Sequence, residues 1–503
     1  MKGLKIAVFA GALLAASAGV ASAETVLKIG MQDDPDILDP TLGRSFVGRI
    51  VFASLCDKLF DITPELKVVG QLASGYKWVD DNKGLVITIR SGVRFHDGEP
   101  LDAAAVKYSL ERHLKMQGSF RKGEISSVQS VDVVDDHTVK LNLSAPFSPL
   151  LATLADRAGM IVSPKAAEAA GDKFGNSPVC AGPYKFVERV AQDRIVVQRF
   201  DNYWDKDKIH VDKIVFQPIP DTAVRVANLR AGGLDMIERV APTDLPQLKA
   251  DPKLKILSIG EIGYLGITVN VANGPQSKNP LGQDARIRQA LDLSIDRAAI
   301  NQVVYNGEFI PGNQWVPPSN PYYIKSMPVP QRDVAKAKAL LKEAGVEHPS
   351  FTLMVPNSTD QQQIAQVVQS MAAEAGFDIK IQATEFSSAL KFATEGTMEA
   401  FLIGWSGRVD PDGNVYNFVV CGAPFNDGHY CNADVEKEMK AARAVEDSAE
   451  RLKHYTAAAQ ILLKELPIIY ISHRQWIYAF NTKVEGFTPY PDGLIRPQGI
   501  MVK

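Results

Sequence analysis

The sequence is poor in cysteine, in histidine and in recognisable catalytic motifs. Its 503 residues include four cysteines and eight histidines, and no two histidines lie four residues apart. The pattern H-E-x-x-H is absent, so the sequence predicts no zinc site. Neither G-x-x-x-x-G-K-S/T nor G-x-S-x-G occurs, which leaves no P-loop and no nucleophile elbow. S-x-x-K occurs at 119–122 and 388–391 without its companions S-D-N and K-T-G, so we predict no catalytic residue, no bound metal and no cofactor.

Clusters of positive charge and long apolar runs are also missing after residue 23. The formal net charge is −3, which argues against nucleic acid as a partner because phosphate binding requires clustered Lys and Arg. In residues 1–23, Lys2 and Lys5 precede an apolar run of about 15 residues, shorter than the ~20 that cross a bilayer. Ala21-Ser22-Ala23 follows that run. This order predicts a secretory signal peptide cleaved after Ala23, with a membrane anchor as the alternative.

The four cysteines suggest disulfides, because an even number in an exported protein favours pairing over metal binding. Cys421 and Cys431 are ten residues apart and are predicted to close a small loop. Cys56 and Cys180 are paired by elimination. For these two, the alternative is a pair of small buried thiols.

Predicted helices and strands alternate along the chain, which indicates an α/β protein with more than one lobe. Strands are expected at 24–31, 138–143, 184–189, 194–200, 213–219 and 468–473. Helices are expected at 103–114 after Asp102, at 285–306 after Asp284, and at 334–344 between Asp333 and Gly345. There is no repeat and no low-complexity linker, so we expect strands to join the lobes.

The segment GWSGRVDPDGNVYNF (404–418) is the densest group of unusual residues. Asp410, Asp412 and Asn414 have the spacing of calcium ligands, but a calcium loop requires glycine where Val415 stands and glutamate where Cys421 stands. Turn chemistry accounts for the aspartates and glycines. It does not account for Trp405 and Arg408.

Several stretches together resemble the solute-binding proteins of peptide-type ABC importers, in the dipeptide and oligopeptide branch. The resemblance covers nearly the whole chain after residue 23. It rests on DDPDILDP (33–40), SGVRFHDGEPLDAAAVKYSLERHL (91–114), AGPYKFVE (181–188), LRAGGLDMIE (229–238), YLGITVN (264–270), DARIRQALDLSIDRAAI (284–300), DVAKAKALLKEAG (333–345) and the 404–418 segment with Cys421 and Cys431.

This resemblance implies a two-lobed α/β periplasmic-binding-protein fold (type II, cluster C) with an extra subdomain in the first lobe. The first lobe is expected at 24–265 and 482–503, its inserted subdomain at about 46–176, and the second lobe at 266–481. The chain would cross between lobes near 264–270 and 475–481. A monomer would bind a peptide or peptide-like solute in the periplasm by hinge closure and deliver it to an inner-membrane ABC permease, without catalysis.

The resemblance also implies where ligand would bind. Loops with exposed backbone and small residues can satisfy the N–H and C=O groups of a peptide, each costing about 1–3 kcal/mol if buried unpaired. The predicted ligand contacts are Arg44, Ser45, Phe46, Tyr264, Trp405, Ser406, Gly407, Arg408 and Asp410. The alternative for Trp405 is a core position.

Arg408 departs from the dipeptide-binding branch, in which an aspartate in W-x-G-D pairs with the amino end of the peptide. MVPNSTD (354–360) also lacks the arginine that this branch often carries for the peptide carboxylate. Longer peptides, peptides bound in the opposite sense, or a non-peptide anion such as an opine-like compound or a sugar-phosphate conjugate would each fit. Arginine suits carboxylate or phosphate, so we hypothesise that Arg408 contacts an anionic group of the ligand. The alternative is a structural ion pair with Asp410 or Asp412.

Other functions on this fold remain open from sequence. A chelated metal, haem or oligosaccharide could replace the peptide, and a binding protein can present ligand to partners other than a permease. A secreted hydrolase would require paired acids, for which Asp34, Asp36 and Asp410 are the candidates.

Overall fold

A seven-stranded sheet contains the first strand of the described chain. The computed structural model describes residues 24–503, so the predicted signal peptide and its cleavage after Ala23 lie outside the described residues. In order across the sheet, the strands are β12 (Leu254–Gly260), β19 (Gln475–Asn481), β11 (Met236–Ile237), β1 (Val26–Met31), β10 (Lys213–Pro218), β9 (Arg194–Arg199) and β8 (Tyr184–Val190). β1 is parallel to both of its neighbours, and the other pairs are antiparallel.

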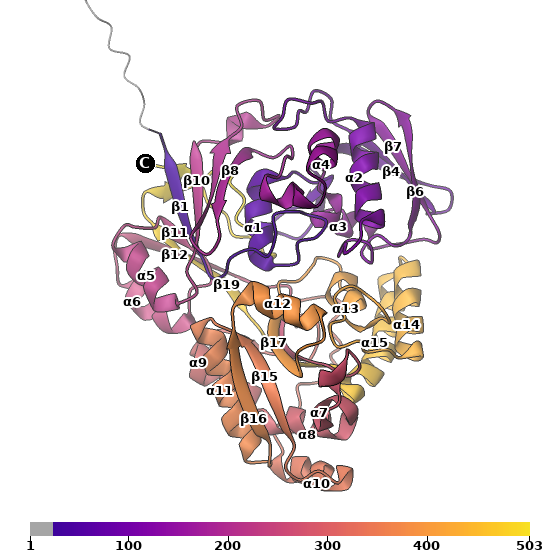
Figure 1. Cartoon of the computed structure of the whole chain (residues 1–503), viewed down its shortest axis with the longest axis vertical. Helices are drawn as coiled ribbons and strands as arrows, with labels where there is room; N and C mark the ends of the chain where they lie inside the picture. Colours follow the sequence, from indigo (N-terminus) through magenta and orange to yellow (C-terminus); the bar gives the residue numbers. More distant parts are fainter. Residues whose placement is uncertain (1–23) are drawn as a thin grey trace, which may run out of the picture.

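A six-stranded sheet forms the lower part of the molecule in Figure 1. Its strands, in order, are β14 (Ile310–Pro311), β18 (Ile468–His473), β13 (Tyr264–Val269), β17 (Ala400–Trp405), β15 (Ser350–Pro356) and β16 (Asp378–Thr384). β15 is parallel to β16 and β17, as expected for strands joined through helices. We call this sheet and its helices the second lobe.

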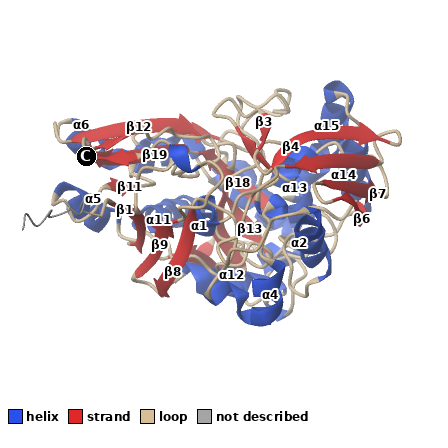
Figure 2. Ribbon diagram, turned by 90° about the horizontal axis from the view of Figure 1, so that it is seen from above, coloured by secondary structure: helices blue, strands red, loops and turns tan. Residues whose placement is uncertain are grey.

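A four-stranded antiparallel sheet lies at the end of the upper part that is remote from the seven-stranded sheet (Figures 1 and 2). Its strands, in order, are β4 (Ala73–Val79), β5 (Gly84–Ile89), β7 (Thr138–Leu143) and β6 (Val128–Asp135). Two further pairs are β2 (Phe60–Ile62) with β3 (Val68–Gly70) and β20 (Val484–Glu485) with β21 (Met501–Val502). The seven- and four-stranded sheets with their helices form the first lobe.

The helices are distributed over both lobes. Those of the first lobe are α1 (Phe46–Leu55), α2 (Ala103–Lys115), α3 (Leu150–Thr153), α4 (Pro164–Ala170), α5 (Thr222–Arg230) and α6 (Leu245–Lys249). Those of the second are α7 (Pro280–Gln283), α8 (Ala285–Ser294), α9 (Arg297–Tyr305), α10 (Val334–Ala344), α11 (Thr359–Ala373), α12 (Phe386–Thr394), α13 (Asp412–Val419), α14 (Ala433–Ala444) and α15 (Ser448–Glu465). No helix within residues 24–503 combines the length and the apolar content that crossing a membrane requires.

Side-chain caps explain where the predicted helices begin. Asp102 accepts a hydrogen bond from Ala105 N at 2.9 Å at the start of α2, and Asp333 caps α10 in the same way. The single helix predicted over 285–306 is wrong. It is two helices, because Asp296 accepts a bond from Ala299 N at 2.9 Å and starts α9 as a separate helix.

The chain crosses between the lobes twice. Residues 261–263 connect β12 to β13, and Arg474 connects β18 to β19. The sequence prediction assigned residues up to 481 to the second lobe, but β19 pairs with β12 from Leu254↔Asn481 to Gly260↔Gln475. The aromatic side chains of β19 are buried in the core of the seven-stranded sheet, so the chain returns to the first lobe at Arg474.

The four-stranded sheet has a core of its own, which begins at Leu59 rather than at residue 46. Helix α1 packs instead in the core of the seven-stranded sheet. Both predicted disulfides are present, Cys56–Cys180 and Cys421–Cys431. The first closes a loop across 124 residues of sequence, and the second closes a loop of ten.

Candidate ligand-binding site between the lobes

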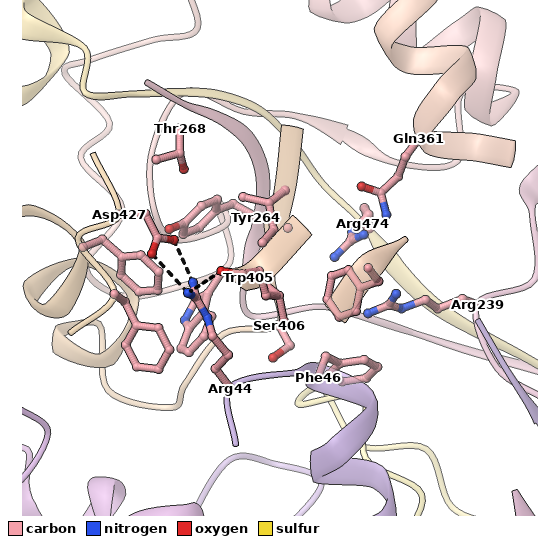
Figure 3. A pocket seen from close by; sticks show the side chains of 16 residues that line it. Arg44, Phe46, Arg239, Tyr264, Thr268, Gln361, Trp405, Ser406, Asp427 and Arg474 are labelled. Carbon is pink, nitrogen blue, oxygen red and sulfur yellow. Dashed lines mark hydrogen bonds and ion pairs between the residues drawn. The ribbon is translucent and has the colours of Figure 1, made fainter. Parts of the chain in front are cut away.

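A pocket of about 760 Å³, its open mouth included, lies between the two lobes (Figure 3). The first lobe supplies Arg44, Phe46 and Arg239, and the crossing supplies Arg474. The second lobe supplies Tyr264, Thr268, Gln361, Phe386, Leu390, Ile403, Gly404, Trp405, Ser406, Phe418, Phe425 and Asp427.

Arg44 reaches across the interface from the loop before α1. Asp36 accepts hydrogen bonds from Arg44 N at 2.7 Å and from the Ser45 hydroxyl at 2.6 Å, which fixes this loop. The Arg44 guanidinium donates to Asp427 in the second lobe, from Nη1 to Oδ1 at 3.1 Å and from Nη2 to Oδ2 at 2.7 Å. Arg44 Nη1 also donates to Thr394 Oγ1 at 2.6 Å. These bonds join the lobes, so the structure is the closed form.

An aromatic wall forms the part of the pocket next to this pair. The rings of Trp405 and Phe418 are 4.8 Å apart, those of Trp405 and Phe425 are 5.3 Å apart, and Phe418 stacks on Phe425 at 5.6 Å. Phe46 faces the pocket from the first lobe and stacks on Trp476 at 4.5 Å. Such surfaces favour apolar portions of a ligand.

Arg239, Arg474 and Gln361 lie together on the other side of the pocket (Figure 3). Arg474 Nε donates to Glu261 Oε2 at 3.3 Å, which ties the two crossings together. The Arg474 guanidinium lies over Gly404, where an added Cβ would stand 2.6 Å from Nη2. Within residues 24–503, the buried Gln361 Oε1 has no hydrogen-bond partner. The free amide oxygen and the guanidinium heads could therefore bond to polar groups of a ligand.

The structure brings together five of the predicted site residues in this pocket: Arg44, Phe46, Tyr264, Trp405 and Ser406. Ser45 instead begins α1, where its hydroxyl accepts a bond from Gly48 N at 3.2 Å. Gly407 has φ of 82°, and an added Cβ would stand 2.4 Å from the Ile262 carbonyl carbon. Glycine is thus required for the close approach of the crossing to the 404–408 turn.

Arg408 and Asp410 line a smaller neighbouring pocket of about 430 Å³, its open mouth included. Arg408 pairs with Asp156 of the first lobe, not with Asp410 or Asp412 as the structural alternative held. Asp410 pairs with Arg451 at 2.7 Å and Asp412 with Arg443 at 2.7 Å. The Arg408 guanidinium also stacks on Trp405, 4.2 Å from the ring centroid.

The acids considered for a hydrolase are each held by separate partners. Asp34 pairs with Arg189 at 3.0 Å, Asp36 accepts bonds from the Arg44–Ser45 loop, and Asp410 pairs with Arg451. Within residues 24–503, no group of three or more His, Cys, Asp or Glu side chains is placed to hold a metal ion.

Among the charged and amide side chains that line the pocket, sequence reasoning missed Arg239, Gln361, Asp427 and Arg474. Two of them had a usable signal. Arg474 directly follows the predicted strand 468–473, where a crossing was expected nearby, and Asp427 lies inside the predicted Cys421–Cys431 loop. Arg239 and Gln361 carry no local signal because they reach the pocket only through the tertiary fold.

Strand β17 presents a free edge to the pocket. All six of its residues pair with β13 on one side, from Tyr264↔Trp405 to Val269↔Ala400. On the other side, β15 pairs only with Ala400 and Phe401. No described strand covers that edge over 402–405, and Ile403, Gly404 and Trp405 line the pocket.

Two lobes joined by two crossings, with a pocket enclosed between them, define a solute-binding protein of the periplasmic type. The model of the bacterial extracellular solute-binding proteins, family 5, matches residues 67–426, and the chain belongs to this family. The family members are solute-binding proteins, not enzymes.

Relatives and solved structures match this chain over nearly their whole length. The glutathione-binding protein GsiB of Salmonella paratyphi A is 30% identical over 497 residues, covering 95% of this chain and 94% of that protein. The binding protein AgaA of A. tumefaciens R10, solved with agropinic acid, is 28% identical with a TM-score of 0.86. The match covers 95% of this chain and 99% of that chain. The protein DppA of Helicobacter pylori, solved with the peptide STSA, has a TM-score of 0.87 at 23% identity. The match covers 95% of this chain and 98% of that chain.

Proposed function

We propose that the chain is the periplasmic solute-binding component of an ABC importer and captures a peptide or peptide-like solute between its lobes. Residues 1–23 direct export and are removed after Ala23. The first lobe comprises 24–262 and 475–503, and the second comprises 263–473. The mature monomer delivers the solute to an inner-membrane permease and has no nucleic-acid partner.

The free edge of β17 is the observation that carries this proposal. An extended backbone can add to an unpaired strand edge by hydrogen bonding to it. The aromatic wall beside this edge can hold a side chain, and the donors of Arg239 and Arg474 can bond to carbonyl oxygens. The similarity to a glutathione-binding protein supports a solute that contains peptide bonds.

A non-peptide anionic solute is the second candidate. Arg44, Arg239 and Arg474 all line the pocket with their guanidinium groups. The solved relative AgaA holds agropinic acid. Arginine binds carboxylates through two hydrogen bonds, so an opine-like acid would fit such a pocket.

One experiment separates these candidates. The mature protein is purified natively and unfolded, and the released small molecules are identified by mass spectrometry. The compounds found, with glutathione and agropinic acid, are then added to stripped and refolded protein in a thermal-shift series. A ligand at ~100 times its Kd adds about 2.7 kcal/mol of stability. Varied short peptides support the first candidate, and one non-peptide acid supports the second. A protein that carries and binds none of them would contradict both.

A further inference from the structure

Four arginines surround two carboxylates where the lobes meet beside Arg408. The arginines are Arg49, Arg121, Arg157 and Arg408, and the acids are Asp156 and Glu124. Asp156 contacts Arg49 at 3.1 Å, Arg157 at 3.9 Å and also Arg408, while Glu124 pairs with Arg121 at 2.8 Å. None of the six side chains is more than 11% exposed. With all six ionised, the cluster has two more positive than negative charges.

The pKa values in this cluster reflect the excess of positive charge. Burial alone would raise the pKa of Asp156, but Arg408, Arg49 and Arg157 hold it well below its usual range. Burial, reinforced by Arg49, lowers the pKa of Arg408 to about 10. Another negative charge placed here would therefore be stabilised.

Arg408 has a hydrogen-bond donor to offer such a charge. Its Nε contacts Asp156, and its Nη1 donates to Gly407 O at 2.8 Å. The buried Nη2 has no hydrogen-bond partner in the described part of the chain, although the side chain is only 10% exposed. Arg408 lines the smaller pocket, which shares Trp405 and Phe425 with the main pocket.

The remaining acids of this pocket, Asp410 and Asp412, do not cancel the excess of positive charge in the cluster. Asp410 is held by two hydrogen bonds from Arg451, at 2.7 and 2.8 Å. Asp412 is held by two from Arg443, at 2.7 and 2.8 Å. Each of these ion pairs is neutral, so the two extra positive charges belong to the cluster around Asp156 and Glu124.

The opposite side of the main pocket, around Arg239 and Arg474, has no such excess of positive charge. Three arginines there interact with four acids. The arginines are Arg225, Arg239 and Arg474, and the acids are Asp33, Glu238, Glu261 and Asp360. Even with the pKa of Asp33 raised by burial to about 7, the acids match or outnumber the bases. An acidic group is therefore better placed beside Arg408 than beside Arg239 and Arg474.

We propose that an acidic group of the solute, a carboxylate or a phosphate, occupies the pocket beside Arg408 and accepts a hydrogen bond from Arg408 Nη2. This inference rests on the proposed function and specifies one chemical feature of the solute. Asp156 and Glu124 belong to the first lobe and Arg408 to the second, so the anion lies between residues of both lobes. An acidic solute thus stabilises the closed form more than an otherwise identical neutral one.

Calorimetric titration of three proteins tests the proposal: wild type, Arg408→Gln and the control Arg286→Gln. The Arg286 side chain is 41% exposed and pairs with Asp284 within the second lobe. The probes are glutathione, agropinic acid and the solute released from native protein. Each is used with free acidic groups and with its carboxylates methylated or its phosphate removed. Neutralising the acid should weaken binding to wild type and Arg286→Gln about tenfold or more, and to Arg408→Gln less than about threefold.

Each other outcome has a defined meaning. Equal losses in wild type and Arg408→Gln would place the acidic group elsewhere, and no loss in wild type would show that no acid is recognised. Either result overturns the inference while leaving the proposed function in place. A wild type that binds neither form of any probe overturns the proposed function, and the inference with it.

The variant Arg408→Lys provides a second test in case Arg408→Gln does not fold. Lysine keeps the positive charge but lacks the planar fork of donors. This variant should recover part of the affinity and part of its sensitivity to neutralising the acid. Thermal unfolding of all variants without solute shows whether they are folded, and an Arg408→Lys that is folded but insensitive to the acid contradicts the inference.

Discussion

Arg44 and Asp427 form a buried two-bond ion pair between the lobes, with side chains 7% and 8% exposed. Because the two residues come from different lobes, opening the pocket separates them. We predict that Arg44→Gln and Asp427→Asn each shift the protein towards the open form, since each leaves one charge without its partner. The double variant should lose about 0.5–3 kcal/mol less free energy of solute binding than the sum of the losses of the two single variants.

Small-angle scattering and solute titration of the four proteins in this cycle provide the measurement. Scattering reports the open fraction, and titration reports the free energy of binding. Arg286→Gln serves again as the control, because its ion pair lies within one lobe and is partly exposed. Strictly additive effects of Arg44→Gln and Asp427→Asn would contradict the coupling.

Gly404→Ala is predicted to weaken solute binding without much effect on stability. The added Cβ would stand 2.6 Å from Arg474 Nη2, at the far end of a flexible side chain. The guanidinium would move rather than the strand, so the free energy of unfolding should change by less than about 1 kcal/mol. Displacing that donor should lower affinity about tenfold.

Gly260→Ala is the matched control for Gly404→Ala, because nothing lies within 4 Å of its added Cβ. Denaturant unfolding measures stability and calorimetry measures affinity for both variants. If Gly404→Ala bound solute as tightly as Gly260→Ala, Arg474 would have no direct role in binding.

His473, next to the crossing, should make stability depend on pH. Its Nδ1 lies 2.7 Å from Gly263 O, and burial lowers its pKa to about 4. The folded-state pKa is below the unfolded value of about 6.5, so protonation of His473 favours the unfolded chain. The free energy of unfolding is therefore unaffected by His473 above pH 6.5 and decreases as pH falls from about 6.5 towards 4. The loss amounts to about 1.4 kcal/mol per pH unit.

Comparison with His473→Gln isolates this contribution from those of other titrating groups. Free energies of unfolding are measured for both proteins at pH 7 and pH 5. The difference between wild type and variant should change by about 2 kcal/mol between the two pH values, in favour of the variant at pH 5. Parallel pH profiles would show that His473 does not titrate as the burial implies.

The two disulfides should differ in what their removal changes. Loop-closure entropy predicts a loss of about 5 kcal/mol for Cys56→Ala with Cys180→Ala, and about 3 kcal/mol for Cys421→Ala with Cys431→Ala. The shorter loop carries Phe425 and Asp427, so its removal should weaken solute binding more strongly. Denaturant unfolding and titration of both pairs check this, and an equal effect on affinity would contradict it.

The sequence predicted the features that depend on local chemistry. Asp102 and Asp333 cap helices as expected, and both disulfides and the two-lobed α/β fold were predicted correctly. The break between α8 and α9 was missed although Asp296 carries the signal, because the apolar pattern continues through it.

Features that depend on contacts between the lobes could not be predicted. Four polar residues at 472–475 interrupt the apolar run of 468–480 around Arg474, but a polar interruption does not by itself show that the chain changes sheets there. Arg408 has two aspartates close by in sequence, yet it pairs with Asp156 of the other lobe. Only the tertiary fold decides such a choice.

The Cys421–Cys431 bridge links the formation of the binding pocket to the redox state of the surroundings. Its loop holds one aromatic wall residue, Phe425, and the partner of Arg44, Asp427. Thiols stay reduced in the cytosol and oxidise beyond the inner membrane. If the chain is exported as proposed, this bridge would close only after export, and copies still in the cytosol would bind solute more weakly.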